Sequence, residues 1–179
     1  MLLNSYEKII LNDKSLEMTV GEEQEIKFST EPEQTEAEDL EWISSDEDVA
    51  EVDDYGKITA ISAGKTKITV QTEDGEVSAN LNVVVKPETT EFNSVKTSKK
   101  KIILKWDRVN GVGGYQISYS TSKTFKGAKN IKEKAKSTTS TIKNLRSKKT
   151  YYIRIRTYQT ISGKKYYSSW SSIGSIKVK

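Results

Sequence analysis

Apolar and aromatic residues alternate with polar ones along most of this chain of 179 residues. A two-residue period places successive side chains on opposite faces of a β-strand, whereas a helix needs apolar residues three and four positions apart. The alternation is clear in residues 66–70 (TKITV) and 151–156 (YYIRIR), and no segment carries a convincing helical stripe. The pattern therefore predicts an all-β protein whose inward-facing side chains fill the space between paired sheets.

The charged residues divide the chain into two parts of opposite sign. Residues 1–87 contain 7 lysines, no arginine and 21 acidic residues, which is a net charge of −14. Residues 88–179 contain 22 lysines and arginines and 4 acidic residues, which is a net charge of +18. So abrupt a change indicates two units. We expect two β-sandwiches, 1–87 and 88–179, joined by a short, semi-rigid connection near Pro87, and we expect the first to be antiparallel.

Four short motifs follow one another in the first part. They are Trp42-x-Ser-Ser-Asp, Val49-Ala-x-Val, Gly56-x-Ile-x-Ala and Gly64-x-Thr-x-Ile. In this order they resemble the bacterial immunoglobulin-like group 2 domain, and the resemblance extends over about residues 7–86. It implies a β-sandwich module that is common in bacterial surface proteins and adhesins.

The second part places Trp106 on its second expected strand and Tyr115 on its third, and Leu145 stands six positions before Tyr151. These features resemble the fibronectin type III domain over about residues 90–179, in the lysine-rich form found in Gram-positive cell-surface proteins. The resemblance implies a tyrosine corner, in which the Tyr151 hydroxyl bends back to the backbone near Leu145.

Together the two resemblances imply two tandem immunoglobulin-like β-sandwich domains. Each domain is expected to bury one tryptophan, Trp42 in the first and Trp106 in the second.

The segment 148–158 (KKTYYIRIRTY) contains the main candidates for binding. Alternation directs Arg154 and Arg156 away from the core. Trp170, expected on the next strand after a hairpin, would lie between them, so that cation–π contacts clamp the last two strands. The alternative is that the same arginines bind a phosphate or a sugar.

Trp170 and a neighbouring tyrosine also suggest a platform on which a sugar ring can stack. Adjacent residues of a strand face opposite sides, so at most one of Tyr166 and Tyr167 joins Trp170. The candidate ligand-binding residues are therefore Trp170, Arg154, Arg156 and Tyr167, and the ligand is unknown.

The sequence gives little support to catalytic chemistry, for which carboxylate pairs, a Lys/Tyr dyad or a Ser/Lys pair are the remaining options. The chain has no cysteine and no histidine, which excludes disulfides, thiol nucleophiles and Ser/His triads. The acidic segment 46–54 lacks the spacing of a calcium loop, and Asp46 and Asp48 are expected to cap turns instead. The glycine-rich segment 111–114 precedes a strand rather than a helix, so it is not a phosphate loop. We expect no enzyme, no metal and no cofactor.

Composition also limits the partners. The lysines of the second part are scattered along strands rather than gathered around readers of bases, so we expect no nucleic-acid binding. No apolar run approaches the length of a membrane span, so we expect no membrane insertion. The opposite charges of the two parts predict weak head-to-tail self-association that salt would screen. A protein, cell-wall or carbohydrate ligand remains unidentified.

The leading interpretation is a non-catalytic extracellular spacer or adhesion module of a bacterial surface or secreted protein. The alternative is a carbohydrate- or cell-wall-polymer-binding accessory module of a larger secreted enzyme. Both place the chain outside the cell or on its surface, and we expect its signal sequence to lie outside this fragment.

Overall fold

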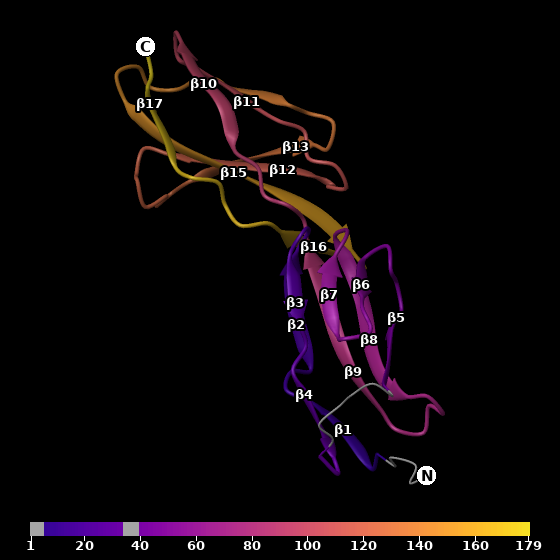
Figure 1. The fold of residues 1–179 in the computed structure, drawn as a ribbon. Coiled ribbons are helices and arrows are strands. Elements are labelled where there is room, and N and C mark those ends of the chain that lie inside the picture. The colour runs from indigo at the N-terminus through magenta and orange to yellow at the C-terminus, as the bar shows by residue number, and fades with distance from the viewer. Residues whose placement is uncertain (1–5, 34–39) are drawn as a thin grey trace. The chain divides into compact units, whose positions relative to one another are not determined.

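The computed structural model describes residues 6–33 and 40–179, and it confirms the all-β fold class: the described residues form strands and no helix (Figure 1). The chain divides into two compact units, Met1–Lys86 and Pro87–Lys179, called the first and second unit below. Within the described residues there is no helix long and apolar enough to cross a membrane.

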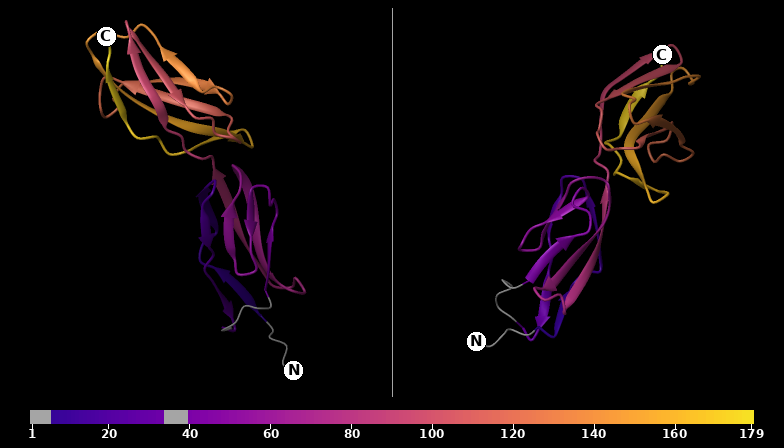
Figure 2. Two further views of the ribbon diagram at one scale, coloured as in Figure 1. Left: turned by 45° about the horizontal axis from the view of Figure 1, so that its top comes forward. Right: turned by 90° about the vertical axis from the view of Figure 1, so that its right-hand side faces the viewer.

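Residues 6–33 and 40–86 of the first unit form nine strands, and Figure 2 shows them from two further sides. They are β1 (Lys8–Leu11), β2 (Ser15–Thr19), β3 (Glu23–Glu25), β4 (Phe28–Glu31), β5 (Leu40–Ser44), β6 (Ala50–Val52), β7 (Lys57–Ala60), β8 (Gly64–Thr72) and β9 (Ser78–Lys86). One sheet has the order β2-β9-β8-β5, a second has the order β3-β7-β6, and β1 pairs with β4. The expectation of an antiparallel sandwich is wrong at one pair, because β2 and β9 run parallel. From β1 the chain continues along the unit into β2. Strand β2 therefore pairs with β9, the last strand of the unit, in the same direction and forms the edge of the sheet.

The interior of the first unit is filled by inward-facing residues of the long strands, such as Ile58, Ile68 and Val83. Trp42 departs from the prediction of full burial, because it is only half-buried. It lies on β5, which is the edge strand of its sheet among the described residues. The ring packs edge-to-face on Phe28, with centroids 5.5 Å apart, and lies against the backbone of Gly56.

Turns of the acidic segment are closed differently from the expectation. The Asp53 carboxylate accepts hydrogen bonds from the backbone N–H groups of Tyr55 and Lys57, at 3.0 and 2.8 Å. At Asp46 it is the backbone carbonyl that accepts, from the N–H groups of Val49 and Ala50. The prediction that the side chains of Asp46 and Asp48 cap the turns is therefore wrong in its choice of residue, since Asp53 has this role.

The second unit contains eight strands. They are β10 (Phe92–Ser98), β11 (Lys101–Trp106), β12 (Gly114–Ser120), β13 (Lys129–Lys134), β14 (Thr139–Ile142), β15 (Thr150–Ile161), β16 (Lys164–Tyr167) and β17 (Gly174–Lys177). The sheet β10-β11-β14 faces a larger sheet in which β13, β12, β15 and β16 follow one another and β17 also pairs with β15 (Figure 1). All of these pairs are antiparallel.

The core of the second unit has the predicted composition. Trp106 is 2% exposed and packs on Tyr115, with ring centroids 5.2 Å apart. Tyr151 is buried, and its hydroxyl accepts a hydrogen bond from the backbone N–H of Arg146 at 3.1 Å. Arg146 directly follows Leu145, so the predicted tyrosine corner is confirmed.

Candidate ligand-binding face

The outer face of β15 carries the two candidate arginines. Burial along the strand alternates as the sequence predicts: Tyr151, Ile153 and Ile155 are buried, and Arg154 and Arg156 are half-buried on the opposite side. Across the sheet, Arg156 lies opposite Gln116 of β12, and Gln116 lies opposite Lys132 of β13. This outer face therefore combines side chains from three adjacent strands.

Rings and guanidinium groups alternate along the arginine side of β15. The Cζ atom of Arg154 lies 4.0 Å from the Phe125 ring centroid and 4.2 Å from that of Trp170. The Cζ atom of Arg156 lies 4.2 Å from the Trp170 centroid and 3.8 Å from that of Tyr167. We call this series, Phe125–Arg154–Trp170–Arg156–Tyr167, the ladder. It contains the predicted stack of both arginines on Trp170.

Trp170 reaches the ladder from an irregular segment and not from a strand, which corrects the expectation. Residues 168–173 lie between β16 and β17. The Ser168 hydroxyl accepts from the N–H of Thr157 at 3.0 Å, and the Ser171 hydroxyl accepts from the N–H of Ile155 at 2.9 Å. Gly174 then pairs with Ile153.

These three contacts are spaced differently on the two sides. They fall on every second residue of β15 and on every third residue of the segment 168–174. Serine hydroxyls replace some of the backbone groups that form the hydrogen bonds between two regular strands. Trp170 directly precedes Ser171, so its side chain is free to project outward. This three-residue spacing explains how a segment that is not a strand delivers the indole ring between two arginines.

Sequence reasoning missed Phe125. It lies in the connection between β12 and β13 and has a backbone φ of 56°, in the left-handed region that an aromatic residue seldom adopts. Ser120 helps to hold this connection, since its hydroxyl donates to the Lys126 carbonyl at 3.0 Å. A positive φ at a phenylalanine cannot be read from sequence, so only the folded loop shows that Phe125 completes the ladder.

The arginines are partly desolvated but carry no counterion. Arg156 donates its Nε–H to the Oε1 atom of Gln116 at 2.8 Å, whereas the Nε of Arg154 is buried without a hydrogen-bond acceptor. Burial lowers the pKa of both guanidinium groups from the ordinary value. At Arg156 the Tyr167 side chain opposes this shift and Arg154 adds to it. Both groups still remain cationic at neutral pH, because the ordinary pKa of arginine is so high.

The contacts of the ladder bear on whether a sugar ring can stack on the face of Trp170. A sugar stacks on an exposed aromatic face, but the two arginines approach the Trp170 ring at the same distance from successive outward positions of β15, so the ring lies between them. Tyr167 also has one face covered by Arg156. All four predicted ligand-binding residues, Arg154, Arg156, Trp170 and Tyr167, are brought together, and the Trp170 ring contacts both arginines.

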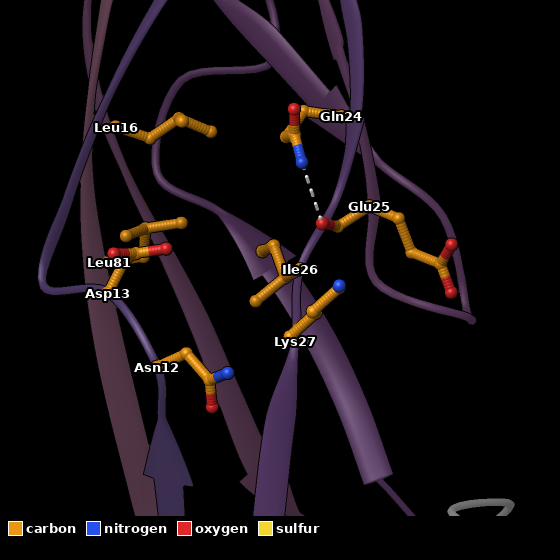
Figure 3. A pocket seen from close by; sticks show the side chains of 8 residues that line it. All are labelled: Asn12, Asp13, Leu16, Gln24, Glu25, Ile26, Lys27 and Leu81. Atoms are coloured by element: carbon orange, nitrogen blue, oxygen red, sulfur yellow. Dashed lines mark hydrogen bonds between the residues drawn. The ribbon is translucent and has the colours of Figure 1, made fainter.

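A cavity of about 260 Å³ lies in the first unit (Figure 3). It opens where the chain passes from β1 to β2 and from β3 to β4, between polar side chains such as Asn12 and Gln24 and the apolar side chains of Leu16, Ile26 and Leu81. The side chains of Gln24 and Glu25 are not joined to one another, since Gln24 donates to the Glu25 backbone carbonyl. Across residues 6–33 and 40–179 no group of three or more acidic residues is arranged to hold a metal ion.

Two similar proteins have enzyme names, and this chain matches a small part of each. A polysaccharide lyase 8 family protein, HylA, of Enterococcus faecalis is 27% identical over 120 residues, which cover 64% of this chain and 9% of that protein. An A type blood N-acetyl-α-D-galactosamine deacetylase of Flavonifractor plautii is 31% identical over 83 residues, which cover 46% of this chain and 11% of that protein. The chain spans about a tenth of the length of these relatives.

Among solved structures, the FN1–FN3 domains of chicken CNTN1 align with 98% of this chain and 66% of that one, at 16% identity and a TM-score of 0.46.

Two family profiles match in tandem and without overlap. The profile of the bacterial Ig-like domain (group 2) matches residues 6–83, and that of the fibronectin type III domain matches residues 85–173. Both matches agree with the motifs in the sequence and with the two all-β units of the structure. The chain is therefore a bacterial Ig-like domain of group 2 followed by a fibronectin type III domain.

Proposed function

We propose that this chain is a non-catalytic spacer that holds other parts of a larger secreted bacterial protein apart. Domains of both families are accessory modules. The interiors of both units are filled by side chains, and chains of this kind offer little room for a substrate between their sheets. The chain covers only a small part of the relatives that it matches, which is the pattern expected of a module within a longer protein.

The observation that carries the proposal is the shortness of the joint. The carbonyl of Lys86, the last residue of β9, accepts a hydrogen bond from the N–H of Val20 and so belongs to the first unit. The carbonyl of Glu88 accepts from the Thr157 hydroxyl at 2.6 Å and so belongs to the second. Only Pro87 stands between them, and its ring restricts its own φ. A joint with so few unrestrained torsions suits a spacer better than a flexible tether.

Distance measurements between the two units test this proposal. The chain has no cysteine, so Tyr55→Cys in the first unit and Lys136→Cys in the second give unique sites for spin labels. Both positions are exposed. We expect a narrow distance distribution by pulsed electron paramagnetic resonance. The same pair in a variant with Gly-Ser-Gly-Ser inserted between Pro87 and Glu88 provides the flexible reference.

Thr157→Val in the labelled protein removes the hydroxyl that holds Glu88 while keeping a buried side chain of similar volume. We expect a distribution of intermediate width. If the unmodified protein is as broad as the insertion variant, the chain is a tether and the spacer proposal is wrong.

A second candidate is that the larger protein is an enzyme acting on polysaccharide, with this chain as its accessory module. The names of the two relatives favour it, since one is a polysaccharide lyase family protein and the other a deacetylase. Deletion of the chain from the parent protein would then reduce activity on polymeric substrate more than on short oligosaccharides. Equal loss on both substrates would contradict this role. Adhesion to a cell surface stays a prediction.

A further inference from the structure

We propose that the outer face of β12, β13 and β15 in the second unit binds an acidic polysaccharide that carries carboxylate groups. This surface, called the basic face below, is formed by outward-facing side chains. They are Gln116, Asn130, Lys132, Lys134, Arg154 and Arg156. The inference rests on the second candidate function, an accessory module of an enzyme that acts on polysaccharide, and names the class of polymer that such a module would hold.

Strand register places the cations of the basic face in neighbouring rows. Lys132, Gln116 and Arg156 form one row across three strands, and Asn130, Ser118 and Arg154 form the next. Rows that lie two residues apart are about 7 Å from one another, and Lys132 lies about 10 Å from Arg156, at twice the spacing of strands. Positive charges at these intervals match the anionic groups of an extended polymer better than a single small anion.

The positive charge of this surface is not neutralised within the unit. No ion pair joins two residues of the second unit, all of which the structure describes. Three of its four carboxylates instead accept from uncharged donors: Glu133 from Ser140, Glu91 from the N–H of Ser172, and Asp107 from Asn93. Glu133 lies on β13 but points away from the basic face, since it alternates with Lys132 and Lys134.

The arginines are held in place before any ligand arrives. Each guanidinium group contacts two aromatic rings, and Arg156 also donates to Gln116. Side chains that are already ordered lose less conformational entropy on binding. A partly desolvated charge without a counterion gains from an anion at its exposed edge, and the fork of N–H donors suits a planar carboxylate.

The same contacts favour a hydrophilic polymer over other polyanions. A single-stranded nucleic acid needs aromatic faces on which bases stack, and Trp170 lies between two arginines. A folded protein partner usually places apolar and aromatic side chains at the centre of the contact and few lysines. The exposed side chains of the basic face are lysine and asparagine, so hydrogen bonding and charge dominate recognition.

The test compares two double variants of the whole chain in binding to oligogalacturonate, a linear polymer with a carboxylate on each sugar. Lys132→Gln with Lys134→Gln removes two charges from the basic face, and neither lysine belongs to the ladder. Lys101→Gln with Lys105→Gln removes two exposed lysines from β11 in the opposite sheet. At about 50 mM salt, where screening is weak, we expect the first pair to weaken affinity about tenfold and the second to weaken it much less.

Each other outcome overturns the proposal. Absence of binding at low salt, or equal losses in the two double variants, would mean that no specific face exists. Stronger binding of polyphosphate than of oligogalacturonate would assign the face to phosphate polymers. Concentration-dependent self-association in sedimentation, abolished by Lys132→Gln with Lys134→Gln, would assign it to the acidic first unit of a second copy. Because the distance measurement on the joint uses no ligand, a failure here leaves the spacer proposal to be judged separately.

Discussion

The two units hold neighbouring strands together with different interactions. In the acidic first unit, ion pairs cross between strands: Lys57 of β7 with Glu23 of β3 at 2.7 Å, and Lys86 of β9 with Glu17 of β2. In the basic second unit no ion pair forms, and the Arg156 guanidinium group of β15 instead contacts the Tyr167 ring of the neighbouring β16, 3.8 Å from its centroid. An aromatic face attracts a cation without a negative charge of its own. A domain with few carboxylates can thus clamp its strands and still present a basic surface.

The two units also differ in how deeply each buries its core tryptophan. Trp106 is fully enclosed between Phe92 and Tyr115, whereas Trp42 is half-buried on an edge strand. We expect Trp106→Ala to destabilise the second unit by about 3–5 kcal/mol, and Trp42→Ala to destabilise the first by about 1–3 kcal/mol. Urea unfolding of both variants, with each unit followed by its own NMR signals, measures the two effects. Equal losses of stability would show that the difference in exposure between Trp106 and Trp42 does not determine their contributions.

Gly56 tests how far the first unit depends on its half-buried tryptophan. Gly56 has a φ of +79°, and a Cβ atom there would lie 2.7 Å from the Cζ2 atom of Trp42. Gly75 has a similar φ of +72° but open space around it. Gly56→Ala should therefore cost about 2–4 kcal/mol, for strain and displaced packing, and Gly75→Ala about 1 kcal/mol, for strain alone. The urea midpoints of the two variants measure the two losses of stability. Similar midpoints would mean that the Trp42 ring moves aside without cost.

The ladder contributes less, because its members are only half-buried. Trp170→Ala removes one ring from between two guanidinium groups, and we expect a loss of about 1–2 kcal/mol in the stability of the second unit. Ser169→Ala changes an exposed neighbour in the same segment and should leave stability unchanged. A loss in Trp170→Ala no larger than in the control would show that the ladder orders the arginines without stabilising the fold.

The smallest expected effect is a pH dependence in the turn between β8 and β9. The pKa of Asp74 is lowered from its ordinary value by the hydrogen bond from the Thr72 hydroxyl and by that from the Glu76 N–H. A lowered folded-state pKa means that the stabilisation is complete above the ordinary value of about 3.9 and is lost as the pH falls below it. Asp74→Asn should reduce this acid-dependent loss of thermal stability in the first unit. Because the turn is exposed, the change will be small, and an unchanged acid profile would contradict the assignment.

Local patterns predicted much of the candidate face. Alternation in β15 placed Tyr151 inside and Arg154 and Arg156 outside, because the side chains of a strand face alternate sides wherever the strand lies. Alternation allows either Tyr166 or Tyr167 beside Trp170, and Tyr167 is the candidate predicted from the sequence. The structure places Tyr167 on Arg156, since Tyr167 is the partner of Tyr158 at the end of the hairpin.

By itself the sequence determined the all-β class, the tandem order of two domain families, the opposite charges and the side of β15 on which the arginines lie. These features depend on local spacing and composition, which the folded state keeps. Only the tertiary structure decided that Phe125 closes the ladder, that serines 168 and 171 bring Trp170 to it with a three-residue spacing, and that Trp42 stays half-exposed. These features depend on loop paths and on which strand lies at an edge, and both are set by contacts between residues far apart in the chain.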